Sequence, residues 1–341
     1  MATTFKNFLS NDLANTRTLL HEAIPVTGTI CSGTYSRSNI KEYGHGMFQS
    51  VYDYPHLSSS ANHIFDLSFG YHSTSPIQAA ANSQDTKKQN IYNQMAQVLV
   101  GYDTTGSIKK FTNSAGTEIT DAIFINFARL LTKDEIKKGS FSLSALTGGT
   151  IAAPGGAGGV NMVITDTSGA TGYRVDSPAG EYGYLYDASG VEKGNLYYQA
   201  GVAILSGGLV FDTVYGGQNT TITSADTTSF VTLSTGSVIS AVTDGLRNKL
   251  TNVSFNNTTE LNSTIYFCRV NHNDFNYSSN PTYLSGSKLR VKTMASDAPV
   301  SYITTIGMYS ADNELLAVAK LSEPLRKSSD TELTLRVRLD Y

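Results

Sequence analysis

The residues that could carry out metal chemistry do not fall into a ligand pattern. His45, His56, His63 and His72 are separated by 11, 7 and 9 positions, and neither His-x-His nor HExxH occurs. Zinc sites hold His, Cys or carboxylate ligands at short, fixed spacing. We therefore expect isolated histidines at turns and strand ends, and no bound metal, unless strands bring two of them together.

Motifs for nucleophilic catalysis and phosphate binding are also missing. The chain has no Gly-Lys dipeptide for a P-loop, no Gly-x-Ser-x-Gly elbow, and no third glycine after Gly155–Gly159 to complete a dinucleotide fingerprint. The Asp166-Thr-Ser-Gly169 segment has one residue more than an aspartic-protease loop and is typical of a turn. A pair of glycosidase carboxylates could come from distant strands, but nothing selects one. We expect no enzymatic activity and no cofactor.

Tyrosines form the one dense group of a single residue type. Tyr182, Tyr184 and Tyr186 alternate onto one face of an expected strand, with Tyr197 and Tyr198 close behind. Exposed, they would form an aromatic contact surface for a carbohydrate or a protein. Buried, they would be cross-strand packing, which is the interpretation we favour.

The composition indicates which elements position these residues. Charged residues make up 16% of the 341, Ser and Thr together number 77, Tyr numbers 20, and Trp is absent. The 40% of apolar residues argues against a disordered chain, and the low charge argues against a coiled coil. Such a chain suits β-sheets and large contact surfaces of low charge.

Charge and hydropathy argue against several partners. The net charge of −3 gives no basic footprint for nucleic acid, and no apolar run is long enough for a membrane-spanning helix. Residues Met1–Ser10 lack the pattern of a secretory signal. Cys31 and Cys268 are too far apart in sequence to form a motif, so we expect reduced thiols in a protein made in a reducing cytoplasm.

Charge density divides the chain into three zones. Residues 140–265 hold 4 basic and 9 acidic residues but 19 of the 30 glycines. We interpret them as a β-rich insertion between an N-terminal α+β part (1–139) and a C-terminal β part (266–341) that pack together. The uncharged segment Gly148–Gly159 is expected to be a linker.

Three helices are expected. Apolar residues at three- and four-residue spacing from Phe5 to Ala23 predict the first, which Pro25 ends. The second runs from Asp85 to Val100 and stops at Gly101. The sequence Thr132-Lys-Asp-Glu135 is a capping box that predicts a short third helix ending at Gly139.

Strands are expected in most other places. His63–Tyr71 and Ala122–Leu131 are candidate strands. Hairpin turns are expected after Tyr102, Tyr186 and Tyr309, each with Asp followed by Gly or Asn. From Leu333 to Tyr341 apolar residues alternate with polar ones, so the last strand should be held in a sheet. The fold class is thus mixed α+β and β-dominated, with β-sandwich-like sheets, a few helices near the N-terminus and an inserted β-rich middle domain.

Several segments resemble virion structural proteins of large tailed bacteriophages. Tyr302–Tyr309, Asp312–Lys320 and Leu333–Tyr341 are similar to a tail and baseplate module with a hairpin followed by an alternating strand. The N-terminal stretches Leu19–Pro25, Gly46–Pro55 and Phe127–Gly139 resemble uncharacterised virion proteins of the same phages. Together the stretches cover about a quarter of the chain.

The resemblance implies a non-enzymatic structural protein of the virion, made in the host cytoplasm. We expect it in the tail, at the baseplate, a fibre-attachment site or a neck ring, as a homo-oligomer in contact with other virion proteins, without nucleic acid or membrane. Arg336, Arg338 and Tyr341 on the last strand are expected to contribute to an assembly interface. The alternatives are a host-glycan-binding fibre module, a wall or capsule hydrolase, and a capsid or decoration protein.

Overall fold

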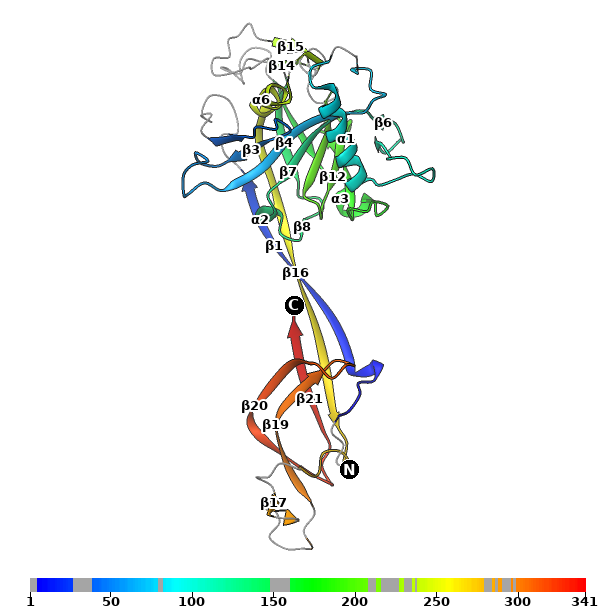
Figure 1. The fold of residues 1–341 in the computed structure, drawn as a ribbon, viewed down its shortest axis with the longest axis vertical. Helices are drawn as coiled ribbons and strands as arrows, with labels where there is room; N and C mark the ends of the chain where they lie inside the picture. Colours follow the sequence, from blue (N-terminus) through cyan, green and yellow to red (C-terminus); the bar gives the residue numbers. More distant parts are fainter. Residues whose placement is uncertain are drawn as a thin grey trace. The chain divides into compact units, whose positions relative to one another are not determined.

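The computed structural model describes residues 5–26, 39–78, 82–147, 160–207, 213–215, 227–229, 235–236, 238–278, 284–285, 288–289, 296 and 299–341 (Figure 1). The chain forms two compact units. Unit 1 comprises residues 1–19 and 260–341, and unit 2 comprises residues 20–259. Strands dominate both units and helices are few, which confirms the expected mixed α+β, β-dominated class.

Unit 2 is built on one antiparallel sheet. Its strands are β2 (Ile40–Glu42), β3 (Gln49–Tyr52), β4 (His63–Tyr71), β7 (Asp121–Phe127), β8 (Glu135–Ile136), β9 (Ser142–Thr147), β10 (Val160–Thr165), β11 (Tyr182–Asp187), β12 (Glu192–Tyr197), β13 (Val202–Ser206) and β16 (Leu250–Val270), the last of which continues into unit 1. Their order is β16-β9-β10-β11-β12-β13-β7-β4-β3-β2, with β8 also paired to β16. Neighbours are antiparallel throughout, as short connections allow.

The sheet curls back on itself. β7 and β16 are six steps apart in the strand order, which would separate them by about 29 Å in a flat sheet. Yet the rings of Phe127 and Phe255, one on each strand, have centroids 5.2 Å apart. Phe141 joins them at 5.8 Å from Phe127, so the enclosed face is filled by aromatic packing.

Both faces of the sheet carry a hydrophobic cluster, because alternate residues of a strand point to opposite sides. Ile123 and Ile125 of β7 belong to the enclosed cluster, and Phe124 belongs to the other. Helix α1 (Asp85–Leu99) covers this second cluster with Tyr92, whose hydroxyl donates to the Ile119 carbonyl at 2.6 Å. The smaller elements of unit 2 are α2 (Arg129–Thr132), α3 (Gly169–Gly172), α6 (Ile239–Lys249), β5 (Phe111–Thr112), β6 (Glu118–Ile119), β14 (Thr213–Tyr215) and β15 (Thr227–Ser229).

Unit 1 consists of strands that meet from the two ends of the chain. Its elements are η1 (Ser10–Asp12), the first part of β1 (Leu13–Val26), the last part of β16, β17 (Leu284–Ser285), β18 (Lys288–Leu289), β19 (Val300–Tyr309), β20 (Leu315–Ser328) and β21 (Leu333–Asp340). β1 and β21 both pair with β16, and β21 does so along Ser263–Val270. β19 and β20 form a separate antiparallel hairpin.

The first predicted helix is wrong. Residues 13–26 form β1, which pairs with β16. The three- and four-residue spacing assumed an apolar face that would be buried, but Leu13, Leu19 and Leu20 are exposed. His21 lies within this strand. Its Nδ1 lies 3.1 Å from the Thr258 hydroxyl on β16, so long-range pairing has overridden local periodicity.

The third predicted helix is wrong as well. Helix α2 ends at Thr132, where the predicted helix was to begin, and Lys133 has a positive φ of 53°. Glu135 and Ile136 then form β8 against Thr258 and Asn257 of β16. The preceding strand is shorter than predicted, since β7 stops at Phe127 before α2.

Other predictions are confirmed. Helix α1 ends at Leu99 before Gly101 (φ +84°), and β4 has the bounds that the sequence predicted. β21 alternates as expected, with Val337 buried and Arg336 and Arg338 exposed. The three hairpins form, but Gly148–Gly159 lies outside the described residues.

The compact units have other boundaries than the zones 1–139, 140–265 and 266–341. β9 to β13, from the expected insertion, lie in the same sheet as β4 and β7 and share their hydrophobic cluster. The strands of the low-charge zone therefore belong to the same compact unit as β4 and β7.

Candidate functional site

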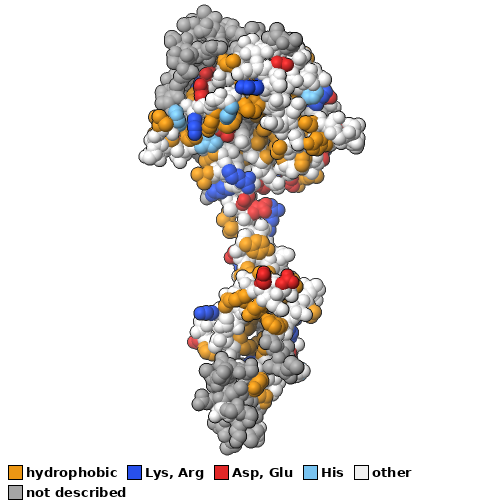
Figure 2. All heavy atoms as spheres, viewed as in Figure 1, with side chains coloured by type: hydrophobic (Ala, Val, Ile, Leu, Met, Phe, Trp, Pro, Cys, Tyr) orange, Lys and Arg blue, Asp and Glu red, His pale blue; other side chains and the backbone are white. Residues whose placement is uncertain are grey.

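The two units differ in where they place apolar side chains. Among the described residues, 39 buried apolar residues lie in unit 2 and four in unit 1, namely Ile265, Val270, Met308 and Val337. In contrast, 13 of the 22 large hydrophobic residues that are exposed in the described ranges lie in unit 1. Some are visible at the surface around β19 and β20 in Figure 2. Large exposed apolar patches mark interaction surfaces, so unit 1 holds the candidate site.

Part of the exposed set lies on the hairpin. Leu315, Leu316 and Val318 of β20 are 54%, 69% and 51% exposed, and Tyr302 and Tyr309 of β19 are 41% and 47% exposed. The N-terminal segment adds Phe5, Phe8 and Leu9. Residues of this kind would be buried in an ordinary domain core.

A groove of about 800 Å³ runs along β19. Every residue from Ser301 to Ser310 borders it, whereas a strand face would contribute only alternate residues. β20 contributes none, although it pairs with β19 along its length. The groove therefore follows the edge of β19 that faces away from β20, and this edge has no strand partner among the described residues.

The opposite side of the groove is formed by Phe5–Phe8 and by Phe267–Val270 of β16. Two contacts close its ends. The ring of Phe5 packs edge-on against Tyr309 at 5.4 Å, and the Ser301 hydroxyl donates to the Phe275 carbonyl. Between these ends Tyr302, Thr304, Thr305 and Gly307 are exposed.

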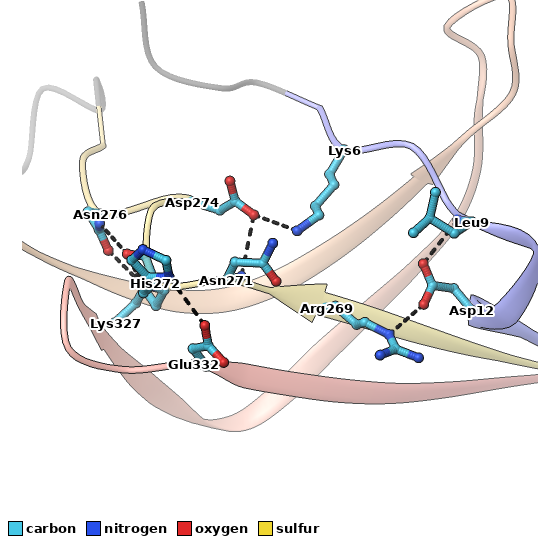
Figure 3. Close-up of polar contacts among 10 residues, drawn as sticks. All are labelled: Lys6, Leu9, Asp12, Arg269, Asn271, His272, Asp274, Asn276, Lys327 and Glu332. Carbon is cyan, nitrogen blue, oxygen red and sulfur yellow. Dashed lines mark hydrogen bonds and ion pairs between the residues drawn. The ribbon is translucent and has the colours of Figure 1, made fainter.

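A polar network holds the N-terminal segment beside this groove (Figure 3). The Lys6 ammonium donates to Asp274 at 2.5 Å, and the Arg269 guanidinium donates to Asp12 at 2.5 Å. The hydrogen bond from Lys6 lowers the pKa of Asp274. The Leu9 backbone N–H, 3.0 Å from Asp12, lowers the pKa of that carboxyl, with a smaller effect of Arg269. Both carboxylates are thus stabilised in the charged form.

Lys327 is the buried centre of the same region. It has no exposed surface, and its Nζ donates to the His272 carbonyl (3.1 Å), the Asn276 side chain (2.6 Å) and the Ser328 carbonyl (2.7 Å). All three donors of the ammonium are therefore used. Lys327 fixes the 271–276 turn against β20, and His272 extends from that turn to Glu332 at 3.3 Å.

Two of the predicted assembly residues, Arg336 and Arg338, lie on β21, and the third, Tyr341, directly follows this strand. Arg338 donates to Asp340 (2.6 Å) and to the Ser263 hydroxyl (3.0 Å), which leaves Arg336 as the exposed arginine without these bonds. Hydrogen bonds from Ser263 and Arg338 lower the pKa of Asp340. Tyr341 is 76% exposed, and its hydroxyl lies 3.0 Å from that of Thr264.

The tyrosines of β11 are packing residues for the most part. Tyr184 is 8% exposed, Tyr182 stacks on the buried Tyr197 at 5.1 Å, and Tyr182 and Tyr184 meet edge-on at 5.9 Å. Burial raises the pKa of Tyr182 well above its usual range. Only Tyr182 and Tyr186 are half-buried, so these residues do not form a broad exposed platform.

Asp166 has a structural role. It is fully buried, and its two carboxylate oxygens accept the backbone N–H groups of Gly139 (2.7 Å) and Phe141 (2.9 Å). Burial raises its pKa, and the two N–H groups partly offset this effect. Gly169 N–H donates to the Asp166 carbonyl at 2.6 Å, which confirms the turn.

The histidines are not brought together as ligands. His63 Nε2 lies 2.8 Å from Asp66, His72 Nδ1 lies 2.9 Å from the Thr74 hydroxyl, and His45 Nδ1 accepts from Met47 N–H at 3.1 Å. Within the described ranges, no group of three or more His, Cys, Asp and Glu residues is arranged to hold a metal ion. Cys268 is half-buried, and Cys31 lies outside the described residues. No described helix is both long enough and apolar enough to cross a bilayer.

Comparison of the chain with protein-family models, curated proteins and solved structures found no match.

Sequence reasoning missed the groove and the exposed apolar residues of unit 1. One signal was available. No charged residue occurs from Ala298 to Ala311, although β-rich surface segments normally carry charge. The arrangement offers an apolar surface and a strand edge that has no partner in the described part of the chain, and both are means of binding a protein chain.

Proposed function

We propose that this protein is a non-enzymatic structural component of a tailed-phage virion that acts through subunit contacts. The expected place is the tail, at the baseplate, a fibre-attachment site or a neck ring. The resemblance of Tyr302–Tyr309, Asp312–Lys320 and Leu333–Tyr341 to tail and baseplate modules supports this proposal. All three segments lie in unit 1, the unit with the exposed apolar surface.

The observation that carries the proposal is the inverted distribution of apolar residues. Unit 2 has the core of an independent folded body, while unit 1 exposes the residues that would form a core. Permanent complexes have interfaces that resemble a domain core cut in half. Unit 1 is therefore the unit that contacts neighbouring subunits, and through it unit 2 is attached to the assembly.

Arg336, Arg338 and Tyr341 belong to the proposed contact surface. They lie on or directly after β21, and Tyr and Arg are the residues most enriched at binding hot spots. Tyr341 offers a flat ring that is 76% exposed while its hydroxyl is held by Thr264. The partner would be another virion protein or a neighbouring copy in a ring.

The glycan-binding alternative is weaker at the site first considered, because Tyr184 is buried and Tyr182 stacks on Tyr197. The capsid alternative keeps the same assembly surface and differs in location. One experiment separates these functions, namely gold labelling of intact particles with antibodies against the purified chain.

Label on the tail, its tip or the neck is the expected result. Label spread over the head would show that the protein is a capsid component and not a tail component. If the protein were missing from intact and disrupted particles alike, the structural function would be wrong. Antibodies against a known head protein and a known tail protein provide the matched controls on the same grids.

A further inference from the structure

The outer strands of unit 1 differ in how their edges are protected. β20 carries Lys320, Glu323, Pro324 and Arg326, and β21 carries Arg336 and Arg338. Charged residues and proline are the usual means of preventing edge-to-edge pairing. β19 has neither, because its ten residues contain no charge and no proline, although its register with β20 shifts between Ile303 and Thr305 and between Met308 and Tyr309.

β19 also has the composition of a strand that pairs well. Ile303, Thr304, Thr305 and Ile306 are consecutive β-branched residues at its centre. Its edge away from β20 borders the groove, and Tyr302, Thr304, Thr305 and Gly307 are exposed there. An edge of this length that is apolar, uncharged and accessible is a template for another strand.

We infer that this edge pairs antiparallel with β19 of a second copy of the chain. The inference rests on the proposed function, since it names the partner at one of the subunit contacts. A two-fold axis through the middle of β19 would give an isologous contact in which the same residues face each other. Because no charge occurs from Ala298 to Ala311, any antiparallel register of β19 on itself opposes only uncharged side chains.

Aromatic surface and charge are compatible with a second copy as the partner. Five of the exposed large hydrophobic residues border the groove, namely Phe5, Phe8, Tyr277, Tyr302 and Tyr309, and they are slightly less than half exposed on average. At roughly 200 Å² per aromatic side chain they present on the order of 450 Å² of apolar surface beside the β19 edge, to which main-chain hydrogen bonds between two paired edges would add. The residues of unit 1 include 11 Lys and Arg and 10 Asp and Glu, so two copies do not repel each other.

The test uses the full chain with the exposed Thr304 changed to either charge. Thr304→Lys and Thr304→Glu each place like charges near one another across the two-fold contact. Each variant alone should therefore associate roughly two- to fivefold more weakly than the wild type in sedimentation velocity. An equimolar mixture should regain wild-type association, because opposite charges then meet. Ser322→Lys on β20, also exposed, is the matched control and should leave association unchanged.

Recovery of association in the mixture shows that both variants are folded. The weaker association of each variant by itself is then a property of the contact. The inference is wrong if the wild type is monomeric at every concentration, if Thr304→Lys associates like the wild type, or if the mixture stays dissociated. The chain could be monomeric by itself and still label the particle, through contacts with another virion protein. In that case the proposed function stands while the self-pairing inference fails.

Discussion

Lys327 makes unit 1 depend on one buried cation. Its three hydrogen bonds end on the His272 carbonyl, Asn276 and the Ser328 carbonyl, and none of them can be replaced by water in a fully buried position. Lys327→Met keeps most of the side-chain volume but leaves these oxygens unsatisfied. We expect it to lower the free energy of unfolding of unit 1 by about 3 kcal/mol.

Urea unfolding followed by hydrogen-exchange mass spectrometry of residues 271–276 would measure this loss. Lys320→Met on the exposed part of β20 is the control and should change stability by less than about 0.5 kcal/mol. Equal effects of the two substitutions would contradict the role given to Lys327.

Two carboxylates predict how unit 1 responds to acid. The pKa values of Asp12 and Asp274 are lowered in the folded chain, so the folded state binds their protons more weakly than the unfolded state does. Their contribution is complete at neutral pH and is lost as the pH falls from about 4 through the folded-state pKa values. Asp274→Asn should therefore flatten the loss of unit 1 stability between pH 5 and pH 3, in the same exchange measurement.

The control for the acid response is Asp312→Asn, which changes an exposed carboxylate in the β19–β20 turn. If it flattened the pH dependence as much as Asp274→Asn, the Lys6–Asp274 pair would not be the cause.

Residue-level prediction from the sequence succeeded where local alternation decides exposure. The pattern in β21 placed Arg336 and Arg338 on the exposed face, as found. The burial of Lys327 could not be predicted, because its acceptors lie 51 and 55 residues away at Asn276 and His272. The same alternation predicts that Tyr341 lies on the face of Val337. Tyr341 instead follows the end of β21 and is exposed.

At the scale of elements, one glycine fixes the contact between β12 and β13. A Cβ at Gly194 would lie 1.9 Å from the Ile204 carbonyl oxygen, which is backbone and cannot move without separating the strands. We expect Gly194→Ala to destabilise unit 2 by at least 3 kcal/mol. Gly44→Ala, where a Cβ would meet nothing within 4 Å, should stay within about 1 kcal/mol of the wild type in the same urea titration.

If Gly194→Ala unfolded at the wild-type urea concentration, the close approach of β12 and β13 would be wrong. The substitution should leave the association measured for unit 1 unchanged, because Gly194 lies in unit 2.

Elements were predictable where the local pattern and the tertiary environment agree. Helix α1 has an apolar face that packs on a hydrophobic cluster, and β4 is buried along most of its length, so both were found with nearly correct bounds. β1 was assigned as a helix because its leucines have helical spacing, but the strand gains its hydrogen bonds from β16, about 240 residues later in the sequence. No local signal reports a partner that distant.

For the whole molecule, the inferred pairing predicts two kinds of unfolding. By mass action, association stabilises the unit whose folded state takes part in the contact. The unfolding temperature of unit 1 should therefore rise with protein concentration, while that of unit 2, which has its own clusters, should not. Calorimetry between 1 and 100 μM measures both, and parallel shifts of the two transitions would contradict the division of roles.

The division into units was the part least accessible to sequence. Gly and charge content changed at residues 140 and 265, but the structural boundaries lie at 19 and 260. Unit 1 combines residues 1–19 with residues 260–341, which are joined by strand pairing and by the side-chain contacts of Phe5, Lys6 and Asp12. The β-rich class could be predicted because composition reports it, whereas the pairing of distant strands leaves no trace in composition.

The pairing of β1 and β21 with β16 also sets the order of events on the ribosome. Unit 2 is complete once residue 259 has emerged, but unit 1 needs Leu333–Asp340, which is translated roughly 15–65 s after Thr16. Until then the sheet formed by β1, β16 and β21 is incomplete. A nascent chain therefore cannot complete unit 1 before its synthesis is nearly finished, and a chain that terminates before Val300 lacks β19 to β21 altogether.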